Sequence, residues 1–176
     1  MTLVIAAVYG LGAWELKQFR DATLSLTAAM AALKDLPQPL PDLSAWLGRV
    51  HPALQNPVRL RIEGERAALP GPALTPYLVG LLVMLGMLGT FLGMVVTFKG
   101  AVFALEGSTD LQAIRSALAA PIKGLGLAFG TSVVGVATSA MLGLMSAISR
   151  RERLDVVRRL DASINTVLRP FSLVHQ

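Results

Sequence analysis

The sequence contains no cysteine, so it has no disulfide framework, no thiolate nucleophile and no thiolate metal site. Charge is scarce as well: 15% of the 176 residues are Asp, Glu, Lys or Arg, and 53% are hydrophobic. Soluble domains carry about 25% charged residues. Together with a mean hydropathy of +0.59, this composition excludes a disordered chain, a collagen-like repeat and a nucleic-acid reader, and it indicates a membrane protein.

Charged residues and histidine are missing altogether from two long apolar runs, Tyr77–Phe98 and Gly124–Ile148. The runs have 22 and 25 residues, and a helix needs about 20 apolar residues to cross the hydrocarbon core of a bilayer. Both are therefore predicted to be transmembrane helices. The chain has no nucleophile beside a base, no carboxylate pair and no clustered metal ligands, so we predict no enzyme, no cofactor and no metal site.

A third apolar run, Thr2–Trp14, has 13 residues before Glu15 and reaches about 20 Å as a helix, which is less than the thickness of the core. Either the true start lies upstream of Met1, which we favour, or the helix continues through Glu15 by snorkelling and packing. Apolar residues at helical spacing from Glu15 to Leu36 predict that this helix extends into the cytoplasm.

Basic residues predict the orientation of the chain. Seven Lys and Arg fall between Glu15 and Thr75, six follow Ile148, and three lie between Lys99 and Lys123. Because cytoplasmic loops carry the excess of Lys and Arg, we expect the N-terminus outside and the C-terminus in the cytoplasm. Anionic lipids of the bilayer, and not nucleic acid, are the expected counter-ions.

The predicted architecture is all-α, an integral membrane protein with three transmembrane helices that extend into the cytoplasm. Eight of the ten prolines lie between Pro37 and Pro76, which predicts a loop with one short turn around Leu43–Val50. The predicted segments are a first transmembrane helix with its extension (1–36), a proline-rich cytoplasmic loop (37–76), a second transmembrane helix (77–98), an outer connection with a short helix (99–123), a third transmembrane helix with an amphipathic extension (124–168) and a tail (169–176).

The second and third runs are rich in small residues. Positions seven apart share a helix face, so Gly86 aligns with Gly93, Thr90 with Thr97, and Ser132 with Ser139. Small residues let helix backbones approach closely in lipid. The predicted packing residues are Gly86, Gly89, Gly93, Gly135, Ser139 and Gly143.

Hydroxyl groups near the middle of the two runs suggest a second role. A lone Ser or Thr in a membrane helix can simply bond the carbonyl of its own preceding turn. Thr90, Thr131 and Ser132, however, lie on or beside the small-residue faces, where their oxygens can hold water or hydrate a passing ion. A proton path normally needs a titratable group, so a carboxylate would have to come from another polypeptide. The candidate pore-lining residues are Thr90, Thr97, Thr131, Ser132 and Thr138.

At these residues the chain resembles the MotA/TolQ/ExbB proton-channel family over about Thr75–Leu160. The stretch LGMLGTFLGM (Leu85–Met94) is similar to the family pattern LGLLGTVxGI, with Gly89, Thr90 and Gly93 on its Gly, Thr and Gly. The stretch AFGTSVVGV (Ala128–Val136) is similar to the patterns ALxxTAxGL and AFxGTFLG. Counting back from Gly135 places Ser132 on the family's threonine and Thr131 one residue earlier, so which hydroxyl faces the pore stays open.

The resemblance implies a homopentamer in the bacterial inner membrane around two helices of a single-span partner similar to ExbD, TolR or MotB. The partner's membrane aspartate would take the proton, Thr90 with Ser132 or Thr131 would line its route, and proton passage would turn the pentamer as a motor stator. Both stretches also resemble the ZorA branch, which is linked to phage defence, but without that branch's long tail we do not expect this role. The alternative is a non-conducting scaffold. Proton or sodium as the ion, and the process that is driven, stay open.

Overall fold

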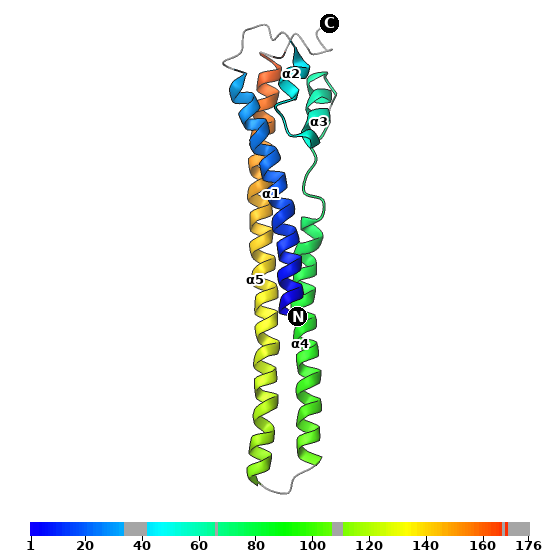
Figure 1. Ribbon diagram of the computed structural model, residues 1–176, viewed down its shortest axis with the longest axis vertical. Helices are drawn as coiled ribbons and strands as arrows, with labels where there is room; N and C mark the ends of the chain where they lie inside the picture. Colours follow the sequence, from blue (N-terminus) through cyan, green and yellow to red (C-terminus); the bar gives the residue numbers. More distant parts are fainter. Residues whose placement is uncertain (34–41, 66, 107–110, 167, 169–176) are drawn as a thin grey trace. The chain divides into compact units, whose positions relative to one another are not determined.

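The computed structural model describes residues 1–33, 42–65, 67–106, 111–166 and 168, with backbone alone at 103–106, 111, 113–118 and 120. In these ranges all regular structure is helical and no strand occurs (Figure 1). The all-α prediction is therefore confirmed for the described part of the chain. The helices are α1 (Thr2–Ala32), α2 (Leu43–Leu47), α3 (Pro52–Ile62), α4 (Thr75–Glu106) and α5 (Leu111–Ile164).

Two of the described helices contain stretches long and apolar enough to cross a membrane, Thr75–Val102 in α4 and Pro121–Ile164 in α5. They include the two uncharged runs from which transmembrane helices were predicted. Helix α1 does not reach the same combination of length and apolar composition in the described residues. The third predicted span, at the start of α1, stays a prediction.

The chain divides into two compact units, of which the first contains Met1–Ala13 and Leu74–Leu144. Its core is built by Ile5 of α1, Leu82 of α4 and Leu142 of α5, all at most 1% exposed. Partly buried residues complete this cluster: Val8, Tyr9, Leu78, Val79 and Leu85. The start of α1 thus lies against both apolar helices.

Helices α4 and α5 pack antiparallel in the first unit (Figure 1). Along their contact, the residue numbers rise on α4 and fall on α5. The contacting pairs, from one end to the other, are Val79 with Gly143, Gly86 with Gly135, Gly89 with Thr131, Gly93 with Ala128, and Thr97 with Gly124. Steps of three, four, seven and eight residues between successive pairs keep one face of each helix turned to the other.

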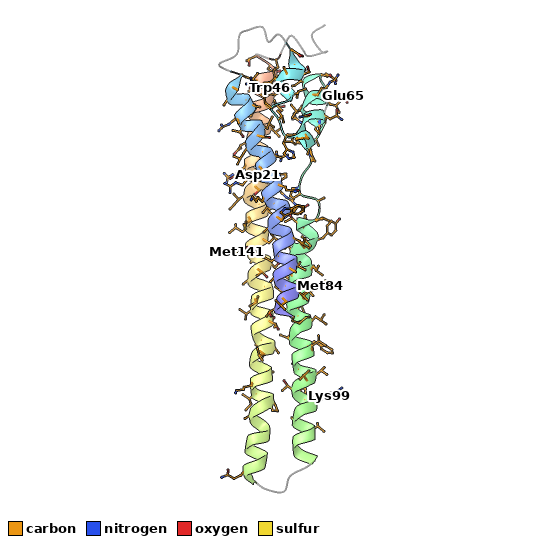
Figure 2. All side chains as sticks on the ribbon, viewed as in Figure 1. Asp21, Trp46, Glu65, Met84, Lys99 and Met141 are labelled. Atoms are coloured by element: carbon orange, nitrogen blue, oxygen red, sulfur yellow. The ribbon has the colours of Figure 1, made fainter. Side chains whose placement is uncertain are left out.

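The second unit contains Trp14–Ala73 and Met145–Gln176. Its core joins the later part of α1 to α2, α3 and the last turns of α5, and Trp46 (Figure 2) lies in it with 2% exposure. The indole Nε1 of Trp46 donates a 2.8 Å hydrogen bond to the carbonyl oxygen of Ala29. A bidentate ion pair at 2.7 and 2.9 Å joins Arg61 in the last turn of α3 to Asp161 of α5.

Side chains and a glycine mark where α2 and α3 begin and end. Asp42 caps α2 by accepting the Ser44 amide at 2.9 Å, and His51 caps α3 through Nδ1, with Pro52 in the first turn. Helix α3 ends at Ile62, and the chain turns away from it at Gly64, whose φ of 99° favours glycine. Hydrogen bonds from the Gly64 amide to Arg61 and from the Glu65 amide to Leu60 complete a Schellman motif.

The interpretation of 37–76 as a loop with one short turn is wrong for the part that the structure describes. Besides α2, it contains the 11-residue helix α3, with Pro57 in its interior. The prolines do not exclude a helix here, because a proline such as Pro52 is well tolerated in a first helical turn. Leu54, Val58 and Ile62, four residues apart, are at most 1% exposed, and their burial compensates for the hydrogen bond that Pro57 lacks.

The helices also extend beyond the boundaries predicted at 98 and 124. Helix α4 continues past Lys99 to Glu106, and α5 begins at Leu111 with Pro121 in its interior. The predicted boundaries marked where charge resumes, and a charged residue limits the membrane-embedded stretch without ending the helix. At the chain ends, α1 closes at Ala32 and α5 at Ile164, short of the predicted 36 and 168; the predicted tail, 169–176, lies outside the described residues.

Candidate functional site

Helices α4 and α5 meet backbone to backbone at Gly86 and Gly135. A Cβ placed on Gly135 would lie 2.7 Å from Gly86 Cα and 2.9 Å from the Leu82 carbonyl oxygen. A Cβ on Gly86 would meet Gly135 Cα and the Ser132 carbonyl oxygen, both at 3.2 Å. Because these neighbours are all backbone atoms, no rotamer change could make room, and the helices would have to separate.

The other predicted packing residues follow the same contact face, here called the α4–α5 seam. A Cβ on Gly89 would lie 2.6 Å from Thr131 Oγ1, and one on Gly93 would overlap Ala128. Gly143 is looser, with Val79 at 3.8 Å. Ser139 adds a polar link, because its hydroxyl, buried in the seam, donates a 2.8 Å hydrogen bond to the Val79 carbonyl. All six predicted packing residues thus lie in the seam.

Four of the five candidate pore-lining hydroxyls donate a hydrogen bond to a carbonyl of their own helix, three or four residues earlier. This is the ordinary behaviour of a lone Ser or Thr in a membrane helix. The hydroxyl hydrogen is used in this bond, and the lone pairs of the hydroxyl oxygen stay available to accept a hydrogen bond from water. The Ser132 hydroxyl makes no hydrogen bond to another of the described residues. The four bonds are Thr90 to Met87 at 2.6 Å, Thr97 to Gly93 at 2.7 Å, Thr131 to Ala128 at 2.7 Å, and Thr138 to Val134 at 2.7 Å.

The structure distinguishes the two neighbouring hydroxyls on α5. The Thr131 side chain lies in the seam against Gly89, whereas Ser132 contributes its backbone Cα and carbonyl oxygen to the contact with Gly86. Thr97 likewise meets α5 at Gly124. Thr90, one residue beyond Gly89, is partly exposed and is not recorded in contact with Thr131. Within one chain, the seam therefore brings Thr131 and Thr97 against the other helix.

Beside Thr131 the seam opens into a groove of about 280 Å³. Apart from the Thr131 hydroxyl its lining is apolar, and no charged residue takes part. The lining residues are Met1, Gly89, Leu92, Gly93, Val96, Gly124, Leu127, Ala128 and Thr131. The groove has room for water or an apolar chain, and none of the side chains that line it carries a carboxylate, an imidazole or an amine.

Acidic groups are absent from the two apolar helices over most of their length. The sequence has no Asp or Glu from Thr75 to Leu105, or from Leu111 to Arg151. In the described residues no group of three or more His, Cys, Asp or Glu lies close enough to hold a metal ion. The seam can therefore supply hydroxyl and carbonyl oxygens, but not a proton-accepting carboxylate.

The outward faces of α4 and α5 carry large apolar side chains (Figure 2). On α4, Met84, Phe91 and Phe98 are each about two-thirds exposed, and on α5, Leu127 and Val133 are as open. Soluble monomers rarely expose contiguous apolar patches larger than a few hundred Å². These faces need lipid or another apolar protein surface.

Arg153, in the second unit, is a buried group that sequence reasoning missed. It lies in the cluster Arg150–Arg153, where composition cannot tell one basic residue from the next. Helical phase would have found it, because it continues the buried stripe of α5: Ser146, Ser149, Arg153, Val156 and Leu160. Its contacts are considered below.

Comparison of the chain with protein-family models, with curated proteins and with solved structures finds no match.

Proposed function

We propose that this chain is the stator subunit of an ion-driven motor in the bacterial inner membrane, similar to the MotA/TolQ/ExbB family. Its N-terminus lies outside, three helices span the bilayer, and the C-terminus is cytoplasmic. The observation that carries the proposal is the α4–α5 seam, which joins the acid-free apolar stretches of two helices through glycine and presents the Thr131 hydroxyl at their contact.

Exposed apolar side chains support a membrane location and association into a homo-oligomer. Only 17% of the most apolar window of α4 is buried within the chain, and 22% for α5. Lipid covers part of this surface at no cost, since it is as apolar as the side chains. In the proposed assembly, five copies around a central partner bury the remaining faces against one another.

Hydroxyls without acids support conduction that depends on a second polypeptide. A Thr that donates to its own helix keeps lone pairs for water, and waters ordered in this way can relay a proton to a carboxylate. The seam has no carboxylate, so a single-span partner with a membrane Asp supplies it. Thr131 and Thr90 are the hydroxyls assigned to this route, with Ser132, Thr97 and Thr138 as further lining residues.

The second candidate is a non-conducting scaffold, which one observation favours. Four of the five candidate hydroxyls are satisfied by their own helix. The glycines of the closest seam contacts, Gly86, Gly89, Gly93 and Gly135, are accounted for by close packing alone. A scaffold would need Gly135 and Ser139, but it would not need Thr90 or Thr131.

The test is a flux measurement on the complex that the chain forms in its native membrane. The tagged full-length chain is cross-linked in the host, its partner is identified by mass spectrometry, and the purified complex is reconstituted in vesicles containing a pH-sensitive dye. We expect the wild-type complex to dissipate a pH gradient. Thr90→Val and Thr131→Val should each lower the flux at least about tenfold, since each removes a water ligand from the route, while leaving the yield of complex unchanged.

Thr27→Val is the matched control, because Thr27 also bonds its own helix, at the Thr23 carbonyl, and lies outside the apolar runs. Repeating the measurement with a sodium gradient and a sodium dye decides the ion. A partner without a membrane carboxylate, or equal flux in wild type and both Thr variants, would remove the case for conduction. Normal assembly with no flux in the wild type would favour the scaffold.

A further inference from the structure

Arg153 is a buried cation whose recorded partners are all neutral. The residue is 6% exposed. Its Nε donates to Thr23 Oγ1 at 2.8 Å, its Nη2 to the Phe19 carbonyl at 2.9 Å, and its Nη1 to the Pro70 carbonyl at 3.2 Å. The guanidinium carbon also lies 4.0 Å from the centroid of the Phe19 ring. These contacts hold the group in place but do not neutralise it.

Four other arginines of the second unit differ in this respect, because each pairs with a carboxylate: Arg20 with Glu152, Arg59 with Glu63, Arg61 with Asp161, and Arg158 with Asp155. Arg153 has no such ion pair in the described residues. Removing a charge from water is unfavourable unless an opposite charge compensates. An arginine guanidinium stays protonated in proteins, so the Arg153 side chain keeps its charge and is held by neutral hydrogen-bond acceptors.

Arg153 lines an open groove of about 180 Å³ within the second unit. The groove runs beside α1, the first turn of α3 and the segment Pro70–Pro72. A guanidinium has five N–H groups, and the three recorded hydrogen bonds leave one on each terminal nitrogen. Two N–H groups on adjacent nitrogens match two oxygens of one oxyanion.

Two further titratable groups line the groove. The Nδ1 of exposed His51 accepts the Ala53 amide at 3.3 Å, so in the neutral imidazole the proton is on Nε2, which can donate. Glu15 lies on the same groove, and its carboxylate would repel an anion. The two residues therefore act in opposite directions on anion affinity, which makes them useful in a test.

We propose that this groove binds a phosphate-bearing anion, with the Arg153 guanidinium as its main ligand and His51 as a second donor. Arg153 follows the end of the uncharged run of α5 by five residues, or about 8 Å of helix rise, which is the depth of lipid headgroups. The phosphate can thus belong to a phospholipid or be free in solution. The site is independent of ion conduction.

The first arm of the test titrates inorganic phosphate. The full-length protein, in a phosphate-free non-ionic detergent, is heated at rising phosphate and constant ionic strength, with chloride as the reference salt. We expect a saturable rise of the melting temperature, because a ligand of the folded state stabilises it. Arg153→Gln should weaken the apparent affinity about tenfold or more, and Glu15→Gln should strengthen it severalfold. Arg49→Gln is the matched control, since Arg49 is exposed and is not among the residues that line the groove.

The second arm separates the two sources of phosphate. The protein is placed in nanodiscs of a neutral glycolipid, which contains no phosphate, with or without phosphatidylglycerol. Stabilisation by phosphatidylglycerol that Arg153→Gln abolishes identifies a lipid headgroup, and stabilisation by inorganic phosphate alone identifies a free anion. If Arg153→Gln does not fold, Arg153→Lys, which keeps the charge but loses the fork, and Glu15→Gln decide. No saturable shift with either source, an equal loss in Arg49→Gln, or no gain in Glu15→Gln would overturn the proposal.

Discussion

Gly135→Ala and Gly130→Ala place the same methyl group on the same helix, five residues apart, in opposite surroundings. At Gly135 the new Cβ would lie 2.7 Å from Gly86 Cα and 3.0 Å from Gly86 N, whereas at Gly130 no atom of another element lies within 4 Å. Carbon atoms prefer about 3.5–4.0 Å, so α4 would have to move by about 1 Å to admit Gly135→Ala.

Overpacking of this kind costs about 1–3 kcal/mol, and here it acts between two backbones that have no side-chain freedom to relieve it. Gly130→Ala meets no obstacle, and Ala is favoured over Gly in a helix interior by about 0.5–1 kcal/mol. Because this preference applies at both positions it cancels, and the free energies of unfolding of the two variants should differ by the overpacking cost, about 1–3 kcal/mol, with Gly135→Ala the less stable.

The assay is reversible unfolding of the full chain in mixed micelles, followed by helical circular dichroism at high dilution, so that the single chain is measured. Gly80→Ala on α4, which also has nothing within 4 Å, serves as a second control. Equal effects of Gly135→Ala and Gly130→Ala, within about 0.5 kcal/mol, would show that the two helices do not meet at Gly86 and Gly135.

Three further predictions concern individual hydrogen bonds and one turn. Ser139→Ala removes the bond to the Val79 carbonyl and should lower the free energy of unfolding by about 1 kcal/mol in the same micelle assay, whereas no loss would mean that the bond is not made. Gly64→Ala, at φ 99°, should destabilise the second unit by about 1–2 kcal/mol, and Gly71→Ala, where no positive φ applies, should not; equal melting temperatures of the two variants would exclude the Schellman turn. Hydrogen bonds from Ser44 lower the pKa of Asp42 below 3.8, so its cap of α2 persists as the pH falls to 3.8 and is lost as the pH falls through the lower pKa. Amide exchange at Ser44, taken relative to the intrinsic rate of an unprotected amide at the same pH, should rise in that window in wild type but not in Asp42→Asn, and a relative rate that does not change with pH in wild type would exclude the cap.

Patterns that depend on one helix at a time were predicted well from the sequence. The uncharged runs lie inside α4 and α5, and Gly86, Gly89, Gly93 and Gly135 share the contact face that seven-residue spacing indicates. Helical phase requires no knowledge of the partner helix. The third span, the oligomer and the conduction of ions are not decided by this phase and stay predictions.

Features that depend on how two segments meet were not predictable in this way. Neighbouring residues point about 100° apart on a helix. Whether Thr131 or Ser132 places its side chain against α4 therefore depends on the register of α5 against α4. Helix α3 forms against the prolines of its own sequence because Leu54, Val58 and Ile62 are buried by other elements. The environment of Arg153 depends on a carbonyl of α1 and on one of the segment before α4, and neither contact leaves a trace in local composition.

The long acid-free stretches of α4 and α5 have a consequence for the cell that makes this chain. With no Asp or Glu from Thr75 to Leu105 or from Leu111 to Arg151, these stretches offer no carboxylate to carry protons through lipid. In the stator proposed above, surplus subunits awaiting their partner would therefore leave the energy stored across the membrane intact, and their synthesis would need no strict matching to that of the partner.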